Sequence, residues 1–508
     1  MAIETELKLR LSAEQLAQLR RHALFKTHQI TVAETRRLHN IYYDTPTLDL
    51  HKSKMALRLR RVGGKWLQTL KGGGQVKAGM HQRFEWEVPV PSAKLDFSNL
   101  DTSVWDEHLP PAWRDSLQPV FVTDFYRSSR LLDWQGAIIE VCMDHGEVKT
   151  SDLSSPICEV ELELKSGEPQ QLFELAQAIL AVVSFELEEV SKAEKGFRLL
   201  SGYIAHPVKG NVPKLARSDS LTDGMQTMIW SCLLHFQGNL HGAMTGCDAE
   251  YLHQMRVALR RLRVVLRMCE KIRADEVLTI LREELAVLGV TLGRLREWDV
   301  FITQTLNPMR CTIEGNIGQQ CLQALLEASS QCRADCYASL RTQSRELQGM
   351  MLRFAIWMNG SYWQQAAGDA PNLCEFANKR LHQLARRYAN AGLGLHTLDA
   401  QQLHALRIYT KKLRYSAEFF ASLYPVHQAK SYLAALGEMQ ELLGQINDIA
   451  VADRLLDDLA GKLPGNLAAH REVIVFIKRV INSDLSIKFN LLQRIGKRFN
   501  KHRVFWGK

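Results

Sequence analysis

Short segments in which apolar and ionised residues alternate occupy most of the first 200 positions of the chain. They cover residues 3–11, 57–62, 65–71, 83–90, 121–131, 138–144 and 158–165. A period of two is typical of β-strands that bury one face. Helical spacing interrupts these segments near residues 13–24 and 170–181. The pattern predicts an α+β domain over residues 1–201, with antiparallel strand pairing.

The pattern changes after residue 201. Residues 202–220 carry Pro207, Gly210 and Pro213 among polar residues and hold no sustained period, as expected of an interdomain linker. Nearly all of the remaining chain has the 3.6-residue period of amphipathic helices. We therefore predict a linker at residues 202–217 and an all-α domain at residues 218–508.

A segment of the helical half recurs 151 residues further along the chain. Residues 252–263 read LHQMRVALRRLR, and residues 403–414 read LHALRIYTKKLR. The same offset places Leu292-Gly293 on Leu443-Gly444, and Glu297 on Asp448. The repeat predicts two related helical bundles, at about 218–365 and 366–508, which share one surface about a pseudo-twofold axis.

Length and composition fit a chain of more than one soluble domain. A chain of 508 residues is too long for one hydrophobic core. No apolar run approaches the roughly 20 residues of a membrane helix, and no signal-peptide region follows Met1. The ten cysteines are scattered without a C-x-x-C pair. These features predict a cytoplasmic protein without a membrane partner.

Charge is distributed unequally between the two halves. Residues 1–200 hold 25 Lys and Arg against 28 Asp and Glu, which leaves 39 against 27 for residues 201–508. The second half is therefore expected to attract polyanions.

The polar faces of the predicted strands are ionised on strand after strand. The alternating charged residues are Glu4, Glu6, Lys8 and Arg10; Arg58 and Arg60; Arg83, Glu85 and Glu87; Glu140 and Asp144; and Glu159, Glu161 and Glu163. Such faces either meet solvent on an open sheet or line the lumen of a closed barrel of about eight strands, with the apolar faces covered from outside by helices. Recurrence on at least five strands favours the closed barrel.

A lumen with this lining calls for particular ligands. Clustered carboxylates repel one another unless divalent cations lie between them, and clustered Arg and Lys favour a polyanion. The first domain is therefore expected to bind a metal–polyphosphate complex.

These residues resemble the CYTH, or triphosphate tunnel metalloenzyme, superfamily. Glu4-Thr5-Glu6-Leu7-Lys8 matches the E-x-E-x-K signature of that family. The family's order continues through Tyr42-Tyr43-Asp44-Thr45, Leu57–Arg60, Arg83-x-Glu85-x-Glu87, Glu159-x-Glu161-x-Glu163 and Ser191-Lys192. The resemblance covers nearly all of residues 1–200, and it implies a tunnel that hydrolyses a triphosphate.

The resemblance also implies residue roles. Substrate phosphates would be held by Arg58, Arg60, Lys71, Arg83, Arg127 and Lys192. Mg²⁺ or Mn²⁺ would be bound by Glu159 and Glu161, with Glu163 or Asp144 nearby, and a second ion by Glu4 and Glu6. We expect Glu4, Glu6 and Lys8 to act on the attacking water and the phosphate chain. Glu85, Glu87 and Glu140 could be metal ligands or could fix neighbouring Arg and Lys side chains.

The helical half resembles a CHAD domain, which implies polyphosphate binding. The matching residues are His253, Arg256, Arg260, Arg263, His404, Arg407, Lys411 and Arg414. The first four follow an i, i+3, i+7, i+10 spacing, which gathers them on one helix face. A solvated basic face is the alternative. We expect Glu297 and Asp448 to anchor Arg side chains, and we expect binding without catalysis.

A tunnel domain followed by this helical domain resembles the bacterial inorganic triphosphatases, which implies tripolyphosphate as substrate and pyrophosphate and orthophosphate as products. Two alternatives keep the tunnel scaffold: a hydrolase of thiamine triphosphate or a nucleotide, and a CYTH-type adenylate cyclase. A third is a polyphosphate-binding scaffold without catalysis. Nucleic acid is disfavoured, because no aromatic stacking platform accompanies the basic helices.

Overall fold

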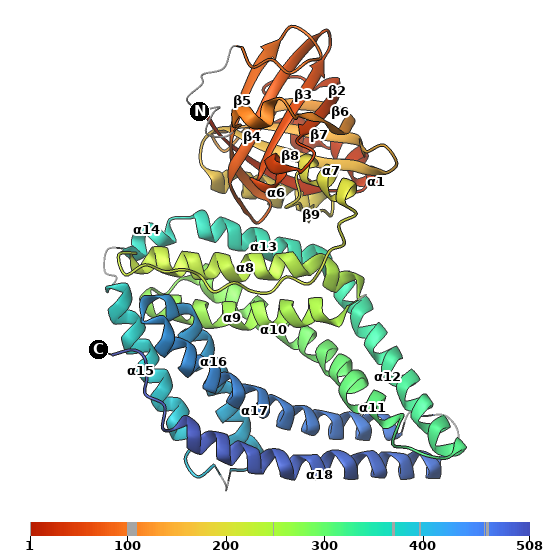
Figure 1. The fold of residues 1–508 in the computed structure, drawn as a ribbon, viewed down its shortest axis with the longest axis vertical. Coiled ribbons are helices and arrows are strands. Elements are labelled where there is room, and N and C mark those ends of the chain that lie inside the picture. The colour runs from red at the N-terminus through yellow and green to blue at the C-terminus, as the bar shows by residue number, and fades with distance from the viewer. Residues whose placement is uncertain are drawn as a thin grey trace. The chain divides into compact units, whose positions relative to one another are not determined.

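The computed structural model describes residues 2–98, 109–246, 248–367, 371–395, 398–461, 463 and 467–507. The chain divides into two compact units. Unit 1 comprises Met1–His206 and Ser344–Gly360, and unit 2 comprises Pro207–Gln343 and Ser361–Lys508. Figure 1 shows strands confined to unit 1 and helices alone in unit 2, among the described residues.

Unit 1 is built on a closed antiparallel barrel. Its strands are β1 (Ala2–Arg10), β2 (Glu34–Asp44), β3 (Met55–Val62), β4 (Lys65–Lys77), β5 (Met80–Val90), β6 (Gln118–Trp134), β7 (Ala137–Lys149) and β8 (Ser154–Ser166). They follow the order β5-β4-β3-β2-β6-β7-β8-β1, and pairing of β5 with β1 closes the ring. The short strand β9 (Glu186–Leu187) adds to β1. The predicted α+β fold with a closed barrel is confirmed.

Strand alternation sorts the side chains between the two faces of the barrel. On β1, Glu4, Glu6 and Lys8 line the internal cavity, whereas Leu7 and Leu9 are fully buried on the other face. Helices α1 (Ala13–Arg21) and α6 (Pro169–Val182) contact β8 from outside. The ionic faces therefore point into the lumen.

Other elements cover the outer wall and one end of the lumen. The outer face of β3–β5 packs against a cluster that includes Leu50, Leu109 and Trp113. Inside the barrel, α7 (Lys192–Ser201) inserts Phe197 into an apolar cluster with Tyr42 and Phe121. The remaining short helices of this region are α2 (Ala23–Thr27), α3 (Asp49–Lys52) and α5 (Pro111–Arg114).

A helix from the distant middle of the chain belongs to unit 1. Helix α13 (Ser344–Asn359) lies beside α6 (Figure 1). Arg345 donates to the carbonyl of Leu180, and the backbone N–H of Leu187 donates to Oε1 of Gln348 at 3.2 Å. The tunnel unit is therefore completed by residues that lie between helices of unit 2 in the sequence.

Unit 2 is helical throughout its described residues. Its longer helices are α8 (Leu221–Thr245), α9 (Ala249–Ile272), α10 (Glu276–Val300), α12 (Asn316–Thr342), α15 (Leu373–Ala391), α16 (Ala400–Phe420), α17 (Val426–Ala460) and α18 (Leu467–Phe499). The shorter elements are the π-helical segment η1 (Phe301–Leu306), α11 (Asn307–Met309), α14 (Tyr362–Ala367) and η2 (Ala421–Leu423). The predicted all-α second half is confirmed. None of the described helices is both long and apolar enough to cross a membrane.

Helix starts in unit 2 recur at the offset seen in the sequence. Helices α9 and α16 begin at residues 249 and 400, and α12 and α18 begin at residues 316 and 467, each pair 151 residues apart. Helices α8 and α15, and α10 and α17, match this offset within one residue. This correspondence is consistent with a duplicated four-helix unit.

Candidate active site in the tunnel

The ionised strand faces enclose a cavity of about 400 Å³. The predicted residues that line it are Glu4, Glu6, Lys8, Arg58, Arg60, Lys71, Arg83, Glu85, Glu87, Arg127, Glu140, Glu161, Glu163 and Lys192. Asp144 and Glu159 are fully buried and lie within reach of this lining, because both contact Lys192. The structure thus gathers every site residue predicted in the first half of the chain at one cavity.

Strand register explains how distant residues meet. Arg127 on β6 pairs with Asp144 on β7, which pairs in turn with Glu159 on β8. Lys8 on β1 lies opposite Glu161 on β8. Directly opposed residues of an antiparallel sheet place their side chains on the same face, so each pair reaches the lumen together.

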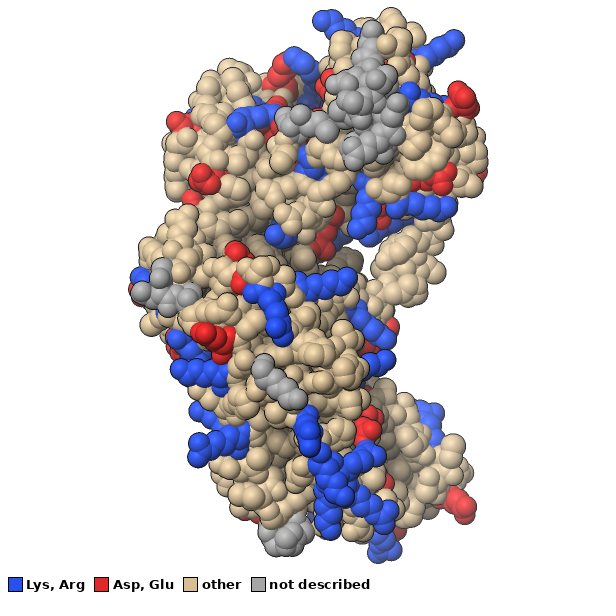
Figure 2. Space-filling model, turned by 60° about the vertical axis from the view of Figure 1, so that its left-hand side comes forward, with Lys and Arg blue, Asp and Glu red and all other residues tan. Residues whose placement is uncertain are grey.

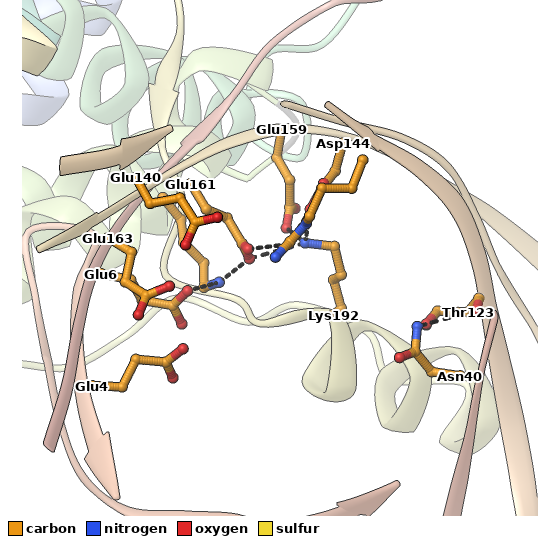
Figure 3. Close-up of polar contacts among 12 residues, drawn as sticks. Glu4, Glu6, Asn40, Thr123, Glu140, Asp144, Glu159, Glu161, Glu163 and Lys192 are labelled. Atoms are coloured by element: carbon orange, nitrogen blue, oxygen red, sulfur yellow. Dashed lines mark hydrogen bonds and ion pairs between the residues drawn. The ribbon is translucent and has the colours of Figure 1, made fainter. Parts of the chain in front are cut away.

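Three carboxylates surround one ammonium group at the deep side of the cavity (Figure 3). Nζ of Lys192, from the start of α7, lies 2.6 Å from Asp144, 2.5 Å from Glu159 and 2.9 Å from Glu161. Arg127 binds Asp144 at 2.6 and 2.8 Å and also contacts Glu161. Lys192 therefore contacts all three predicted metal ligands and also lines the cavity.

The acidic residues of β1 and β5 pair with cations on β1, β4 and β5. Lys71 lies 2.6 Å from Glu4 and 3.1 Å from Glu85. Glu6 lies 2.9 Å from Lys8 and 3.0 Å from Arg83, and Lys8 also contacts Glu161. These contacts join the E-x-E-x-K residues of β1 to charged residues of β4, β5 and β8 in one ionic network.

This network keeps the deep carboxylates ionised. Burial opposes ionisation of Glu6, but the fields of Lys8, Lys71 and Arg83 outweigh it and lower its pKa to about 2. Burial of Glu159 is likewise outweighed by two lysines, and its pKa is also lowered to about 2. By contrast, burial together with two neighbouring carboxylates raises the pKa of Glu4. The site therefore presents anionic oxygen ligands at neutral pH.

The opposite side of the lumen carries arginine side chains whose positive charges are not fully neutralised by nearby carboxylates. Arg58 lies 3.5 Å from Glu85. Arg60 forms no salt bridge with any described residue, and its Nε donates to Oδ1 of Asn40 at 2.8 Å. Asn40 is held in turn by Thr123 at 2.9 Å. Burial, aided by Arg58 and Arg127, lowers the pKa of Arg60 to about 10, so the guanidinium stays charged and favours an incoming anion.

The deep carboxylates suit a divalent cation. Oxygen atoms of Asp144, Glu159 and Glu161 lie within 4.8 Å of one another and are buried. Hard cations such as Mg²⁺ take carboxylate oxygens as ligands, so the donor set fits. The ammonium of Lys192 contacts all three carboxylates, and a cation bound to all three would compete with it.

The supporting carboxylates contact basic or hydroxyl groups. Glu87 accepts from Thr69 at 2.9 Å, and Glu140 lies 2.9 Å from Lys165. Glu163 pairs with Lys165 at 2.6 Å and stands outside the group formed by Asp144, Glu159 and Glu161. Glu85 and Glu140 therefore contact lysines, as the side-chain-fixing role requires, whereas Glu87 lies 4.0 Å from Arg58.

Three basic residues at or beside the cavity were not identified from the sequence. Lys195 binds Glu159 at 2.7 Å and Glu188 at 3.2 Å. Arg36 and Lys165 line the cavity. Lys195 follows Lys192 by three residues, a helical spacing that could have indicated it, but residues 192–201 were not predicted as a helix. Arg36 lies on β2, whose mixed pattern has no regular alternation.

The repeated basic positions of unit 2 come together only in part. Arg256 and Arg260 of α9 and Arg407 and Lys411 of α16 form what we call the paired cluster. Burial and repulsion by Arg260, Arg407 and Arg256 lower the pKa of Lys411 to about 6. The buried Nε atoms of Arg256 and Arg407 have no hydrogen-bond partner. The paired cluster is therefore short of negative charge.

The other repeated positions have different surroundings. His253 lies near the paired cluster, where burial and Arg296 lower its pKa to about 4. His404 is exposed. Arg414 pairs with Glu418 at 2.8 Å within its own helix. Burial and the like charges of Arg267 and Arg282 lower the pKa of Arg263.

The structure also explains Glu297, Asp448 and Gly293, which belong to repeated positions of the two halves. Glu297 binds Arg454 at 2.6 Å, and the charge of Asp448 acts on Arg407 and Lys411. Nη1 of Arg256 lies 3.2 Å from where a Cβ would stand on Gly293. Glycine at that position leaves room for the guanidinium against α10.

Comparison with known families agrees with this architecture. Residues 2–197 match the CYTH domain model, and residues 227–457 match the CHAD domain model. The chain therefore carries a CYTH domain followed by a CHAD domain.

Individual relatives match parts of the chain. An inorganic triphosphatase from Haemophilus influenzae is 34% identical over 202 residues, which are 39% of this chain and 55% of that protein. The chain thus matches about half the length of this relative. A CHAD domain from Ricinus communis is 26% identical, covering 59% of this chain and 98% of that one, with a TM-score of 0.47. A Hippeastrum protein described as a putative adenylyl cyclase with dominant triphosphatase activity is 22% identical, covering 40% and 97%, with a TM-score of 0.30.

Proposed function

We propose that the tunnel hydrolyses inorganic tripolyphosphate to pyrophosphate and orthophosphate, with Mg²⁺ or Mn²⁺ as cofactor. The observation that carries this proposal is the mixed lining of one cavity. Ionised carboxylates suited to a hard cation face the same space as Arg60, which has no acidic partner among the described residues. The resemblance to an inorganic triphosphatase supports the choice of substrate.

The basic side chains have the positions that phosphate binding requires. Phosphoryl transfer depends on positioning and on neutralising charge that spreads over phosphoryl oxygens. Arg58, Arg60, Lys71, Arg83 and Arg127 all line the cavity and would contact the phosphate chain. Their placement on four different strands fixes their spacing, because each strand is held by its neighbours in the barrel.

The acidic side chains would hold the metal and the water. Asp144, Glu159 and Glu161 are the proposed ligands of one cation, and Glu4 and Glu6 of a second. A bound divalent cation would neutralise phosphate charge and lower the pKa of a coordinated water. Lys192 lines the same cavity and would contact the phosphate chain when a cation takes its place among the three deep carboxylates, and Lys8, between Glu6 and Glu161, would connect the two acidic groups.

We also propose that unit 2 binds inorganic polyphosphate through the paired cluster. Arg256, Arg407 and Lys411 form no salt bridge with any residue the structure describes, so an external polyanion would supply the missing negative charge. No described group there combines a nucleophile with a base, which supports binding without catalysis.

The chain is expected to act in the cytoplasm.

The test is phosphate release by the full-length protein. Tripolyphosphate, ATP, thiamine triphosphate and long-chain polyphosphate are compared with Mg²⁺, with Mn²⁺ and with EDTA. The full chain is required, because a fragment ending near residue 200 would lack α13 of unit 1. We expect tripolyphosphate to be the preferred substrate and EDTA to abolish activity.

Matched variants connect the activity to the cavity. Glu4→Gln/Glu6→Gln removes two lumen carboxylates, whereas Glu147→Gln removes one that pairs with Lys149 outside the cavity lining. We expect at least a 100-fold loss of kcat for the first protein and less than a twofold change for the second. Activity that survives EDTA or the double substitution would rule out the metal mechanism. Preference for thiamine triphosphate or ATP, cyclic nucleotide formation, or binding without hydrolysis would each replace the proposed reaction.

A further inference from the structure

The arginine side chains that line the tunnel cavity differ in what holds them. Arg127 makes two hydrogen bonds to a carboxylate, at 2.6 and 2.8 Å. Nε of Arg60, in contrast, donates to the uncharged side chain of Asn40 at 2.8 Å. Nη2 of Arg83 lies 3.1 Å from Nδ1 of His81. A carboxylate partner fixes a guanidinium and cancels its charge, whereas an uncharged acceptor fixes it and leaves the charge available.

Asn40 is fully buried, and both ends of its amide group are in use. Its Nδ2 donates to Oγ1 of Thr123 at 2.9 Å, and its Oδ1 accepts from Nε of Arg60. Asn40 on β2 lies opposite Arg60 on β3 and opposite Thr123 on β6, so the register of three strands sets the direction of the guanidinium. Because the amide nitrogen faces Thr123, the oxygen must face Arg60.

His81 is also buried, and it connects Arg83 to the chain segment that precedes α7. Nε2 of His81 lies 3.2 Å from the carbonyl oxygen of Glu188. A carbonyl can only accept and a guanidinium can only donate, so Nε2 carries the proton and Nδ1 is the acceptor for Arg83. Burial and the charges of Lys8 and Arg83 lower the pKa of His81 to about 3, which keeps the imidazole ring neutral.

Arg60 and Arg83 retain charge and donors for a ligand. Arg60 forms no salt bridge with any described residue, and Arg83 shares the carboxylate of Glu6 with Lys8. The buried Nε of Arg83 has no hydrogen-bond partner. A buried donor is costly to leave without an acceptor, and a phosphate oxygen in the cavity that Arg83 lines could accept from it.

We propose that Asn40 and His81 are positioning residues, which orient Arg60 and Arg83 towards the phosphates of the substrate without neutralising them. This inference rests on the triphosphate hydrolysis proposed above. Neither Asn40 nor His81 is among the residues that line the cavity, so each acts through the arginine that it holds. A carboxylate in either place would also orient the guanidinium, but it would repel a phosphate chain.

The outer surface of unit 1 offers a place for control substitutions. On the face of unit 1 that Figure 2 shows, basic and acidic side chains lie among one another. One added charge on such a surface is screened by solvent and salt, so it should affect anion binding little. Gln18, exposed on α1, and His145, exposed on β7, are suitable positions.

Asn40→Asp is the sharper test, because it keeps the shape and the acceptor and adds one negative charge beside Arg60. Calorimetry in EDTA gives the affinity of the full-length protein for tripolyphosphate, and assays with Mg²⁺ give kcat and KM. We expect an affinity at least tenfold weaker and a KM raised by a similar factor. Asn40→Leu leaves the charge of Arg60 but frees its side chain, so it should lower kcat more than it raises KM.

Gln18→Glu makes the same change from amide to carboxylate outside the tunnel and should stay within twofold of the wild type. Wild-type affinity and KM in Asn40→Asp would overturn the proposal. Equal changes of kcat and KM in Asn40→Asp and Asn40→Leu would overturn it as well, because a purely structural role of Asn40 predicts no difference between them.

His81→Asn and His81→Leu test the second positioning residue. Asparagine places an oxygen near the position of Nδ1 and can still accept from Arg83, whereas leucine cannot. We expect His81→Leu to lose at least tenfold in kcat/KM and His81→Asn to recover most of that loss. Equal losses in the two variants would refute a positioning role for His81. His145→Asn and His145→Leu should both stay within twofold of the wild type.

Separate outcomes distinguish these roles from the function on which they rest. If the wild type prefers another triphosphate, that substrate is used and the same ratios between variants decide. If the wild type hydrolyses no triphosphate, the proposed function fails, and the affinity of Asn40→Asp in EDTA still decides whether the uncharged partner of Arg60 matters for anion binding. All assays are run well below the melting temperature of each variant, so that a general loss of stability does not imitate these differences.

Discussion

Replacing Lys192 by Met tests whether its ammonium occupies the position of a cation among the tunnel carboxylates. The substitution keeps side-chain length and removes a charge that lies 2.5–2.9 Å from Asp144, Glu159 and Glu161. Removing one partner of a buried ionic group leaves uncompensated charge and costs about 3–5 kcal/mol. For a unit of this size, that cost lowers the melting temperature by about 6–20 °C.

Metal should restore much of this loss. A cation at 100 times its dissociation constant contributes about 2.7 kcal/mol. The assay is thermal unfolding of wild-type protein and Lys192→Met in EDTA and across a series of Mg²⁺ or Mn²⁺ concentrations. In the variant, the cation binds three carboxylates without competing with an ammonium, so its melting temperature should rise more steeply than that of the wild type.

Lys195→Met is the matched control, because Lys195 contacts only Glu159 among the three carboxylates. It should destabilise the protein less and leave the metal response near that of the wild type. Equal metal-induced shifts in wild-type and Lys192→Met proteins would refute the reasoning. An unchanged melting temperature of Lys192→Met in EDTA would refute it as well.

Three further predictions concern pH and packing. The pKa values of Glu6 and Glu159 are lowered from 4.5 to about 2, so each carboxylate contributes about 3 kcal/mol to the free energy of unfolding above pH 4.5. This contribution is lost as the pH falls towards 2. Denaturant titrations should show the free energy of unfolding decreasing over this pH range, and Glu6→Gln should make the decrease smaller. The pKa of Lys411 is lowered to about 6, so its amine is mostly neutral at pH 7.5, and binding of polyphosphate should make it take up a proton. The heat of binding measured by calorimetry should therefore depend on the buffer, and this dependence should disappear in Lys411→Met. Gly196→Ala would bring a Cβ within 2.1 Å of the Phe121 ring and should lower the free energy of unfolding by about 1–3 kcal/mol. Because the clash would displace α7, kcat for tripolyphosphate should also fall. A wild-type kcat would contradict a role of α7 in placing the tunnel residues.

Much of the tunnel could be predicted from local pattern. Glu4, Glu6 and Lys8 alternate with buried Leu7 and Leu9 within a single strand. This alternation puts the charged residues on one face of the strand whichever strands pair with it. Strand ends were less predictable. Strand β6 runs from Gln118 to Trp134, beyond the alternating core of residues 121–131, because pairing with β7 continues to Ala137.

Charge pairing within the lumen depended on register. Nothing in the sequence indicates that Lys192 contacts Asp144, Glu159 and Glu161, because these contacts join α7 to residues of two strands that lie 31 or more positions away in the sequence. The same is true of Arg60, whose lack of an acidic partner arises from its place opposite Asn40. Distances between side chains on different strands decide which carboxylates are placed to hold a metal and which are placed to fix neighbouring side chains.

The duplicated helices show the same division. The sequence by itself determined the repeat, its offset and the excess of basic residues, because these are properties of residue order. Only the tertiary structure placed Arg256 and Arg260 of α9 beside Arg407 and Lys411 of α16, since helix packing decides which charges become neighbours. It also placed α13 in the tunnel unit, a long-range contact that no local pattern encodes. Local periodicity thus determined the elements and their faces, and burial with register decided which ionised groups meet.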